Sequence, residues 1–304
     1  MQIGIIGLGK MGAQIARRLY KKGHKVIAWN RSPQPRADFQ RFGGRTAETV
    51  EGLVAALPHR KIVWVMLPAG ETTEEMLERL RALLRSDDII IDGSNSFYED
   101  TIRRAKLFAK RKIHFFDAGT SGGVWGEKNG FAIMVGGPKK SWLRVRPIFK
   151  DLAVGESYGL VGDSGAGHFV KMVHNGIEYG MMEAIAEGYG IINGWDKKID
   201  LAEVTRIWQN GSVIRSWLID LCRDIFEKED LSKVVGYVHQ LGEGEWTVKT
   251  AKKLGVDARV IADSLRVRNE SKKVSNQKLL RNKLLALMRN RFGGHEVVRK
   301  GGGR

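Results

Sequence analysis

The chain has 304 residues, of which 42% are hydrophobic and one is a cysteine, and its formal net charge is +17. This length and hydrophobic content predict a soluble globular protein with two domains. No apolar run approaches the length of a membrane span, and the first residues lead into a glycine turn instead of a signal peptide, so we expect a cytoplasmic protein. The single cysteine, Cys222, excludes an internal disulfide and a cysteine-based metal site.

The positive charge is concentrated near the C-terminus. Residues 266–304 hold twelve Lys or Arg against two Glu. A basic surface of this kind is the electrostatic footprint of phosphate binding, which includes nucleic acids. A solvated basic helix and tail would give the same pattern, so the charge alone leaves both interpretations open.

The N-terminal half alternates between short apolar runs and charged stretches long enough for helices. Residues 3–6 form the first run, a glycine-rich turn and a helical pattern follow, and further runs occur at 26–29, 62–67, 89–92 and 113–117. This alternation predicts an α/β Rossmann-type, doubly wound domain with a parallel sheet over residues 1–164.

From residue 165 onward helical patterns dominate. They cover 166–193, 200–228, 231–239, 246–254 and 258–290. We therefore expect an all-α domain for substrate binding and dimerisation over 165–290, followed by a tail over 291–304 whose glycine-rich end is frayed.

The turn after the first strand reads Gly7-Leu-Gly-Lys-Met-Gly12. In a strand-turn-helix context the first glycine permits the tight turn, the second lets the backbone approach a pyrophosphate, and the third lets helix and strand pack closely. The turn predicts a dinucleotide site, and its expected cofactor-binding residues are Gly7, Leu8, Gly9, Met11 and Gly12.

The second strand ends at Asn30-Arg31-Ser32. NAD-specific enzymes usually carry a carboxylate here, which would repel a 2′-phosphate, whereas a guanidinium can pair with that phosphate. Asn30, Arg31 and Ser32 therefore indicate NADP, with NAD possible. The alternative is that Arg31 is an ordinary surface arginine in a turn.

The segment Gly165–Gly180 sets Lys171, His174, Asn175 and Glu178 at i, i+3, i+4 and i+7. In a helix these four residues share one face. A core-facing helix would place apolar residues there, so this face is better suited to a polar ligand.

This segment resembles the catalytic helix of the 6-phosphogluconate dehydrogenases, decarboxylating members of the β-hydroxyacid dehydrogenase superfamily. The likeness extends from the first strand to Arg289-Asn-Arg-Phe-Gly-Gly-His295, and the length is similar to the short form of the family. The resemblance implies oxidative decarboxylation of 6-phosphogluconate to ribulose 5-phosphate, a step of the pentose phosphate pathway and of gluconate utilization. It also implies a homodimer or higher homo-oligomer with tail-shared sites.

This reaction needs a base for the hydroxyl proton and an acid for the enediol that forms when carbon dioxide leaves. Lys171 is the predicted base and Glu178 the predicted acid, while Asn175 and His174 would hold substrate hydroxyls. No metal is expected, because the β-keto acid supplies its own electron sink and the histidines show no metal-ligand spacing.

The remaining site residues come from the resemblance. Asn95, Ser121, Gly122 and Gly123 follow strands, where ligands of a parallel sheet bind, and are assigned to the sugar acid, with Asn95 also facing the cofactor. The residues assigned to the substrate phosphate are Tyr179, Thr247, Arg268, and Arg289 with His295 from a neighbouring subunit's tail. The chain departs from the family at Gly244-Glu245-Trp-Thr247, where the family has lysine in place of Glu245.

Two other interpretations are weighed. Another β-hydroxyacid dehydrogenase, such as a 3-hydroxyisobutyrate type, shares the glycine turn and a catalytic lysine but lacks the decarboxylation acid and the Phe292-Gly-Gly-His295 tail. A nucleic-acid-binding protein on a Rossmann scaffold would explain the basic C-terminus. Neither explains the polar helix face, so we expect a phosphorylated sugar acid as the partner, and no membrane or nucleic acid.

Overall fold

The computed structural model describes residues 1–239 and 242–301. The chain divides into two compact units, Met1–Lys171 and Met172–Arg304. Among the described residues, no helix combines the length and the apolar character needed to cross a bilayer.

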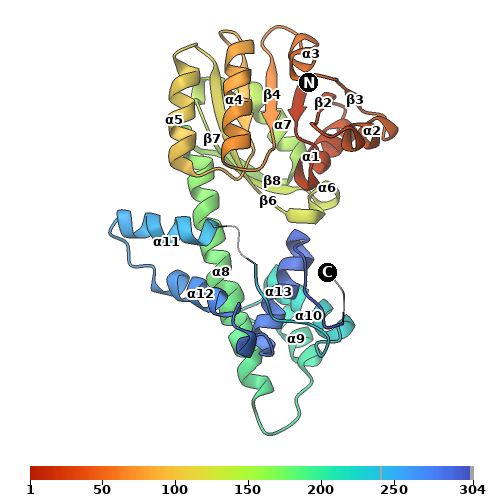
Figure 1. Cartoon of the computed structure of the whole chain (residues 1–304), viewed down its shortest axis with the longest axis vertical. Coiled ribbons are helices and arrows are strands. Elements are labelled where there is room, and N and C mark those ends of the chain that lie inside the picture. Colours follow the sequence, from red (N-terminus) through yellow and green to blue (C-terminus); the bar gives the residue numbers. More distant parts are fainter. Residues whose placement is uncertain (240–241, 302–304) are drawn as a thin grey trace. The chain divides into compact units, whose positions relative to one another are not determined.

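The first unit is built on an eight-stranded sheet with the order β3-β2-β1-β4-β5-β6-β7-β8 (Figure 1). Neighbouring strands are parallel except β6 and β7, which are antiparallel. The strands are β1 (Gln2–Ile6), β2 (Lys25–Trp29), β3 (Arg45–Thr46), β4 (Ile62–Val65), β5 (Ile89–Asp92), β6 (His114–Ser121), β7 (Phe131–Gly136) and β8 (Ala153–Gly162). The predicted Rossmann-type α/β class is confirmed.

Helices cover both faces of this sheet because successive side chains of a strand point to opposite sides (Figure 1). Ile89 and Ile91 of β5 pack in one core cluster, and Ile90 packs in the other. The first cluster includes residues of α1 (Lys10–Lys21), α2 (Pro33–Arg41) and α7 (Lys139–Leu152), and the second includes residues of α3 (Val50–Ala55), α4 (Glu71–Leu83) and α5 (Tyr98–Ala109). The short helices η1 (Gly123–Trp125) and α6 (Gly126–Asn129) lie between β6 and β7.

The second unit is helical, as predicted. Its elements are α8 (Ala166–Asn193), which begins in the first unit, α9 (Leu201–Gln209), α10 (Trp217–Lys228), α11 (Glu243–Lys253), α12 (Arg259–Glu270), η2 (Val274–Asn276) and α13 (Leu280–Gly293). Its core is formed by residues of α8, α10 and α13. Cys222 belongs to this core, and burial raises the pKa of its thiol to about 12.

Three of the predicted helical segments were wrong in detail. The segment 200–228 is broken between α9 and α10, where the Ser216 hydroxyl accepts from the Ile219 amide at 3.3 Å and begins a new helix. The segment 258–290 is broken between α12 and α13. Residues 231–239 form no helix, because Val234 pairs with Arg299 in an isolated β-bridge.

The N-terminal end of α8 is fastened to the sheet of the first unit. The buried Asp117 carboxylate at β6 accepts hydrogen bonds from the amides of Gly165 (2.6 Å) and His168 (2.8 Å), so it caps the helix. At Gly119, a Cβ would lie 2.4 Å from the Lys171 Cβ and 2.7 Å from the Gly167 carbonyl oxygen. The helix therefore packs directly on the strand backbone.

Gly119→Ala should lower the free energy of unfolding by about 1–3 kcal/mol, because the added methyl forces α8 away from β6. Gly188→Ala in α8 is the matched control, since no atom lies within 4 Å of a Cβ built there. Urea denaturation of both variants measures the difference. Equal effects at the two positions would contradict the close packing.

Candidate active site

The three glycines of the first turn have different surroundings. Gly7 has φ +101°, and a Cβ there would lie 2.1 Å from the Met66 carbonyl oxygen. A Cβ on Gly12 would lie 2.0 Å from the Gly7 carbonyl oxygen, whereas nothing lies within 4 Å of one built on Gly9. Packing therefore requires glycine at the first and third positions, and the second faces open space at the start of α1.

The start of α1 is suited to an anion. Its N-cap, Gly9, provides no side-chain hydrogen bond, and its first turn contains no acidic residue. The amides at the start of a helix lack partners within the helix, and with the positive end of the helix dipole they suit an anionic ligand. Gly9 would let a pyrophosphate approach the backbone, so the turn fits a dinucleotide.

Asn30 supports this turn from the end of β2. Its Oδ1 accepts from the Leu8 amide at 2.9 Å, and its Nδ2 donates to the Ser32 carbonyl at 3.1 Å. Arg31 is exposed, and within residues 1–239 and 242–301 it has no hydrogen bond or ion pair. Asn30 therefore stabilises the backbone of the turn, whereas the Arg31 guanidinium is accessible to an anion.

The loop after β5 presents Asn95 at the surface between two buried serines. The buried Asp92 carboxylate accepts from the Ser94 amide at 3.0 Å and lies 3.3 Å from Arg104 Nη1. The same Nη1 donates to the Ser96 hydroxyl at 2.9 Å. A buried ion pair thus holds the loop in shape and leaves Asn95 at the carboxyl end of the strand.

The loop after β6 carries Ser121, Gly122 and Gly123. Gly122 has φ +138° and Gly123 has φ +53°, backbone conformations that favour glycine. The loop is tied to α1, because the Glu127 carboxylate pairs with Arg17 at 2.6 Å and with Lys21 at 2.8 Å. These ion pairs therefore hold the segment that follows the predicted substrate loop against α1, the helix that follows the glycine turn.

Lys171 lies next to β6, near the end of the strand that carries Ser121. Its Cβ lies beside Gly119, and Ser121 is two residues further along the strand, on the same side. The first unit therefore brings Lys171 together with the Ser121 loop. Sequence reasoning missed Asp117, which positions this helix, although it ends an apolar run just as Asp92 does.

The polar stripe predicted for residues 171–178 lies on the continuous helix α8. His174 Nδ1 is 3.3 Å from Asn175 Oδ1 and 4.0 Å from Glu178 Oε2. The side chains of His174 and Glu178 are 41% and 24% exposed, so both are accessible to a ligand.

Directly after the polar stripe on α8, at Tyr179, lies a buried cationic cluster. The guanidinium carbon of Arg268 is 3.4 Å from the centroid of the Tyr179 ring, a close cation–π contact. Arg268 is 1% exposed, and its Nε and Nη1 have no hydrogen-bond partner in the described part of the chain. Arg289 is also buried, and burial together with the charge of Arg268 lowers its pKa to about 10.

Two buried guanidiniums that act on one another are costly unless an anion compensates them. Arg268 has donors unused, and Arg289 Nη1 donates to the His239 carbonyl. Burial raises the pKa of Tyr179, so its hydroxyl stays protonated at neutral pH. The cluster therefore has the chemistry of a phosphate or carboxylate site.

Thr247, which is predicted to contact the substrate phosphate, lies between two helices. Its hydroxyl is buried and lies 2.9 Å from the carbonyl oxygens of both Met172 and Glu243, so its proton is already engaged. A Cβ on Gly176 would lie 2.6 Å from Thr247 Cγ2. Thr247 therefore joins α11 to α8. Glu245, in the first turn of α11, is exposed.

The tail folds onto the second unit of its own chain. The Val235 amide donates to the Val298 carbonyl at 2.9 Å, and Arg299 pairs with Glu229 at 2.8 Å. Arg289 already acts on Arg268 within one chain, so its place there does not require a neighbouring subunit. The predicted frayed end falls on residues 302–304, which lie outside the described residues.

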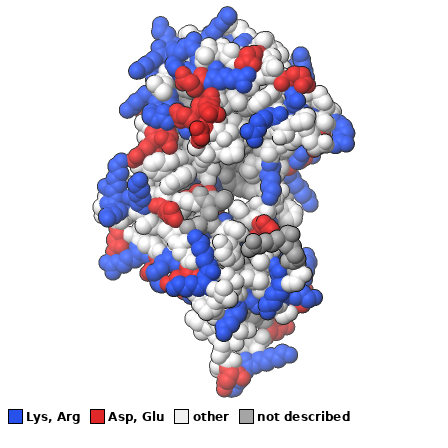
Figure 2. Space-filling view, in the orientation of Figure 1, with Lys and Arg blue, Asp and Glu red and all other residues white. Residues whose placement is uncertain are grey.

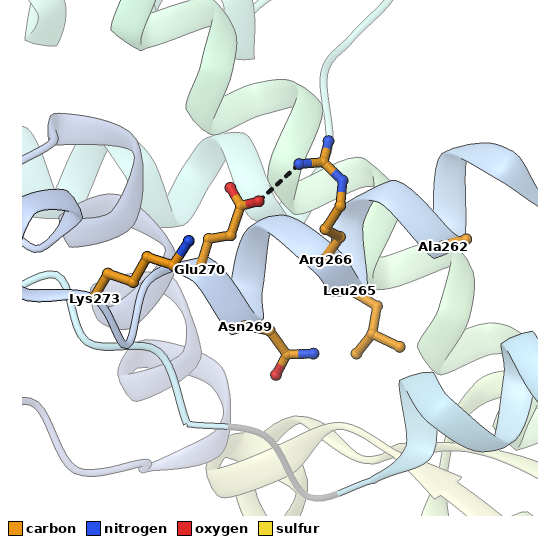
Figure 3. Close-up of a pocket in the computed structure, with 6 residues that line it drawn as sticks. All are labelled: Ala262, Leu265, Arg266, Asn269, Glu270 and Lys273. Carbon is orange, nitrogen blue, oxygen red and sulfur yellow. Dashed lines mark hydrogen bonds and ion pairs between the residues drawn. The ribbon is translucent and has the colours of Figure 1, made fainter.

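A surface pocket of about 410 Å³ lies elsewhere in the second unit (Figure 3). Its lining residues all belong to α12 and the turn after it: Ala262, Leu265, Arg266, Asn269, Glu270 and Lys273. None of the predicted site residues lines it. Two of its lining residues, Arg266 and Glu270, form an ion pair of 2.9 Å.

Charge on the surface is mixed. On the face drawn in Figure 2, Lys and Arg side chains alternate with Asp and Glu and form no continuous basic patch. Across the described ranges, no group of three or more His, Cys, Asp or Glu side chains is arranged to hold a metal ion.

Comparisons with known proteins agree over nearly the whole chain. The family model for the NAD binding domain of 6-phosphogluconate dehydrogenase matches residues 2–162, and the model for the C-terminal domain of that enzyme matches residues 167–300. The NAD(+)-dependent, decarboxylating 6-phosphogluconate dehydrogenase of Haloferax volcanii is 40% identical over 303 residues, which cover 99% of each chain.

The NADP(+)-dependent, decarboxylating enzyme of Bacillus subtilis is 37% identical and matches 87% of this chain, but only 60% of its own length. The solved 6-phosphogluconate dehydrogenase of Plasmodium falciparum superposes with a TM-score of 0.84 at 30% identity, over 89% of this chain and 62% of its own. The two longer relatives therefore contain segments that this chain does not match.

Proposed function

Because the chain belongs to the 6-phosphogluconate dehydrogenase family, we propose that it catalyses oxidative decarboxylation of 6-phosphogluconate to ribulose 5-phosphate with reduction of NADP. The observation that carries the proposal is the buried Arg268, with unused donors, stacked on Tyr179, the residue that follows the polar stripe of α8. This spacing suits a substrate that has hydroxyls at one end and a phosphate at the other.

Lys171 takes the proton of the substrate 3-hydroxyl while the hydrogen on the same carbon leaves as hydride. The bound nicotinamide supplies the hydride acceptor. The resulting β-keto acid then loses carbon dioxide, and the electron pair of the broken carbon–carbon bond enters an enediol. Glu178 protonates that enediol at carbon 1, and His174 and Asn175 hold substrate hydroxyls.

The first unit supplies the cofactor site and part of the substrate site. The turn with Gly7, Gly9 and Gly12 holds the pyrophosphate, and Leu8 and Met11 flank it. Arg31 pairs with the 2′-phosphate of NADP, and Asn95 and the Ser121 loop contact the sugar acid. The open space at Gly9 and the exposed guanidinium of Arg31 support these assignments.

The phosphate of the substrate is held by Arg268 and Arg289 with Tyr179. Glu245 is exposed on α11 while these three residues are buried, which supports keeping the phosphorylated substrate despite the family's missing lysine. Thr247, whose hydroxyl also joins α11 to α8, lies beside Tyr179 in this proposal. In the assembled enzyme, Arg289 and His295 from a neighbouring subunit's tail would complete the phosphate site.

A homodimer is proposed on the exposed apolar side of α8. Ile177, Met181 and Ile191 are 51%, 43% and 77% exposed. Their spacing of four and ten residues places them along one side of the helix. A second copy of the chain would cover them, and we place the assembled enzyme in the cytoplasm.

Purified protein should reduce NADP with 6-phosphogluconate and release one carbon dioxide per NADPH, and gluconate should be a far poorer substrate. The phosphate contributes charge-assisted hydrogen bonds that gluconate lacks. Spectrophotometry at 340 nm with carbon dioxide detection decides the question. Reduction without carbon dioxide would favour a non-decarboxylating β-hydroxyacid dehydrogenase.

Lys171→Met and Glu178→Gln should each lower turnover about a hundredfold or more, with folding intact. They should differ in the first turnover, because Glu178→Gln keeps hydride transfer and gives a burst of NADPH, whereas Lys171→Met gives none. Glu187→Gln, an exposed carboxylate further along α8, is the control. Near-normal turnover in Lys171→Met would show that Lys171 is not the base.

Arg31→Ala should raise the dissociation constant of NADP roughly tenfold or more and leave that of NAD nearly unchanged, because only NADP carries the 2′-phosphate. Fluorescence titration with both cofactors measures the effect. Arg41→Ala, an exposed arginine of α2, is the matched control. Equal weakening of NADP and NAD would show that Arg31 supports only the turn.

A further inference from the structure

The mechanism leaves one buried acid without a role. Glu183 lies on α8 one turn beyond Tyr179, and it is 4% exposed. Neither of its carboxylate oxygens has a hydrogen-bond partner in residues 1–239 and 242–301. A buried carboxyl in this condition is costly when it is ionised, so its presence calls for a physical reason.

Glu183 belongs to the same cluster as Arg268. Arg268 stacks on Tyr179 and donates to the Met182 sulfur at 3.9 Å, so it lies over the turn of α8 that contains Glu183. Tyr179 and Glu183 are four residues apart and share that face of the helix. Arg268 has two unused donor nitrogens, and Glu183 has two unused acceptor oxygens.

The charged groups around Glu183 come from three helices. Arg268 on α12 and Arg281 on α13 favour its ionised form, Glu187 on α8 opposes it, and burial opposes it most strongly. The result is a pKa of about 7 for Glu183. The carboxyl therefore changes its charge in the middle of the neutral range.

We propose that Glu183 is a positioning residue and exchangeable counter-ion for Arg268, ionised while the phosphate pocket is empty and protonated once a phosphate occupies it. The inference rests on the proposed function, because it takes Arg268 as a phosphate ligand. While no anion is bound, the ionised Glu183 balances the charge of Arg268. A bound dianion removes that need and repels the carboxylate, which then takes up a proton.

The sign of the pH dependence follows from this exchange. An anion binds best when Glu183 is protonated, so affinity should fall as pH rises through about 7. Arg289, with a pKa of about 10, stays charged over this range. His174, His239 and His295 are further ionisable groups of the second unit, so a variant of Glu183 is needed to isolate its share.

The test uses inorganic sulfate as the probe, because sulfate keeps its charge between pH 6 and 8. Calorimetric titration of the full-length protein should show about tenfold weaker binding at pH 8 than at pH 6. At pH 7, titration in two buffers of different ionisation enthalpy should show net proton uptake. In Glu183→Gln the pH dependence should shrink to less than about twofold, and at pH 8 this variant should bind sulfate about tenfold more tightly than the native protein.

Glu187→Gln is the matched control. This side chain is 51% exposed and lies 3.5 Å from Arg281, so its loss should leave the pH dependence in place. If sulfate affinity depends on pH as steeply in Glu183→Gln as in the native protein, the proposal is wrong. It is also wrong if the native protein binds sulfate independently of pH and takes up no proton, a result that needs no variant. If Arg268→Met binds sulfate as tightly as the native protein, the phosphate site itself is wrong, and the proposed function fails with it.

Discussion

The packing of α8 on β6 is the constraint on which the rest of the site depends. Asp117 caps the first turn of the helix, and Gly119 allows the strand backbone to touch it at Lys171. The helix runs unbroken to Asn193, and Glu178 lies on it seven residues, or about two turns, after Lys171. A change at Gly119 would therefore act directly on the first residue of the polar stripe.

Charge is handled in two different ways along this helix. At the sheet, buried charges are fully engaged: Asp117 accepts two amides, and Asp92 is paired with Arg104. In the second unit, Arg268 and Glu183 are equally buried but keep unused hydrogen-bonding atoms. Unused donors on a buried guanidinium suit the anion-binding role that we propose for this cluster.

The glycines illustrate the same distinction. Gly7 and Gly12 are required by contacts within the protein, and Gly9 is not. A glycine without an internal reason, at the start of a helix, indicates that something outside the chain comes close. Gly176 has an internal reason, since α11 approaches α8 there through Thr247. Sequence alone cannot tell these cases apart, because each is the same residue in a plausible motif.

The sequence by itself determined the Rossmann-type class, the helical second part, the bounds of α8 and the residues of its polar face, because periodicity and glycine spacing are local signals. The non-helical segment 231–239 was decided by tertiary pairing of Val234 with Arg299, which outweighs local propensity. The break before α10 has a local cause, the cap that Ser216 provides. Only the fold revealed that Thr247 is engaged, that Arg268 and Arg289 share one buried cluster, and that Glu183 lies behind them. Burial and neighbouring charge are properties of the packed chain, and no residue carries them alone.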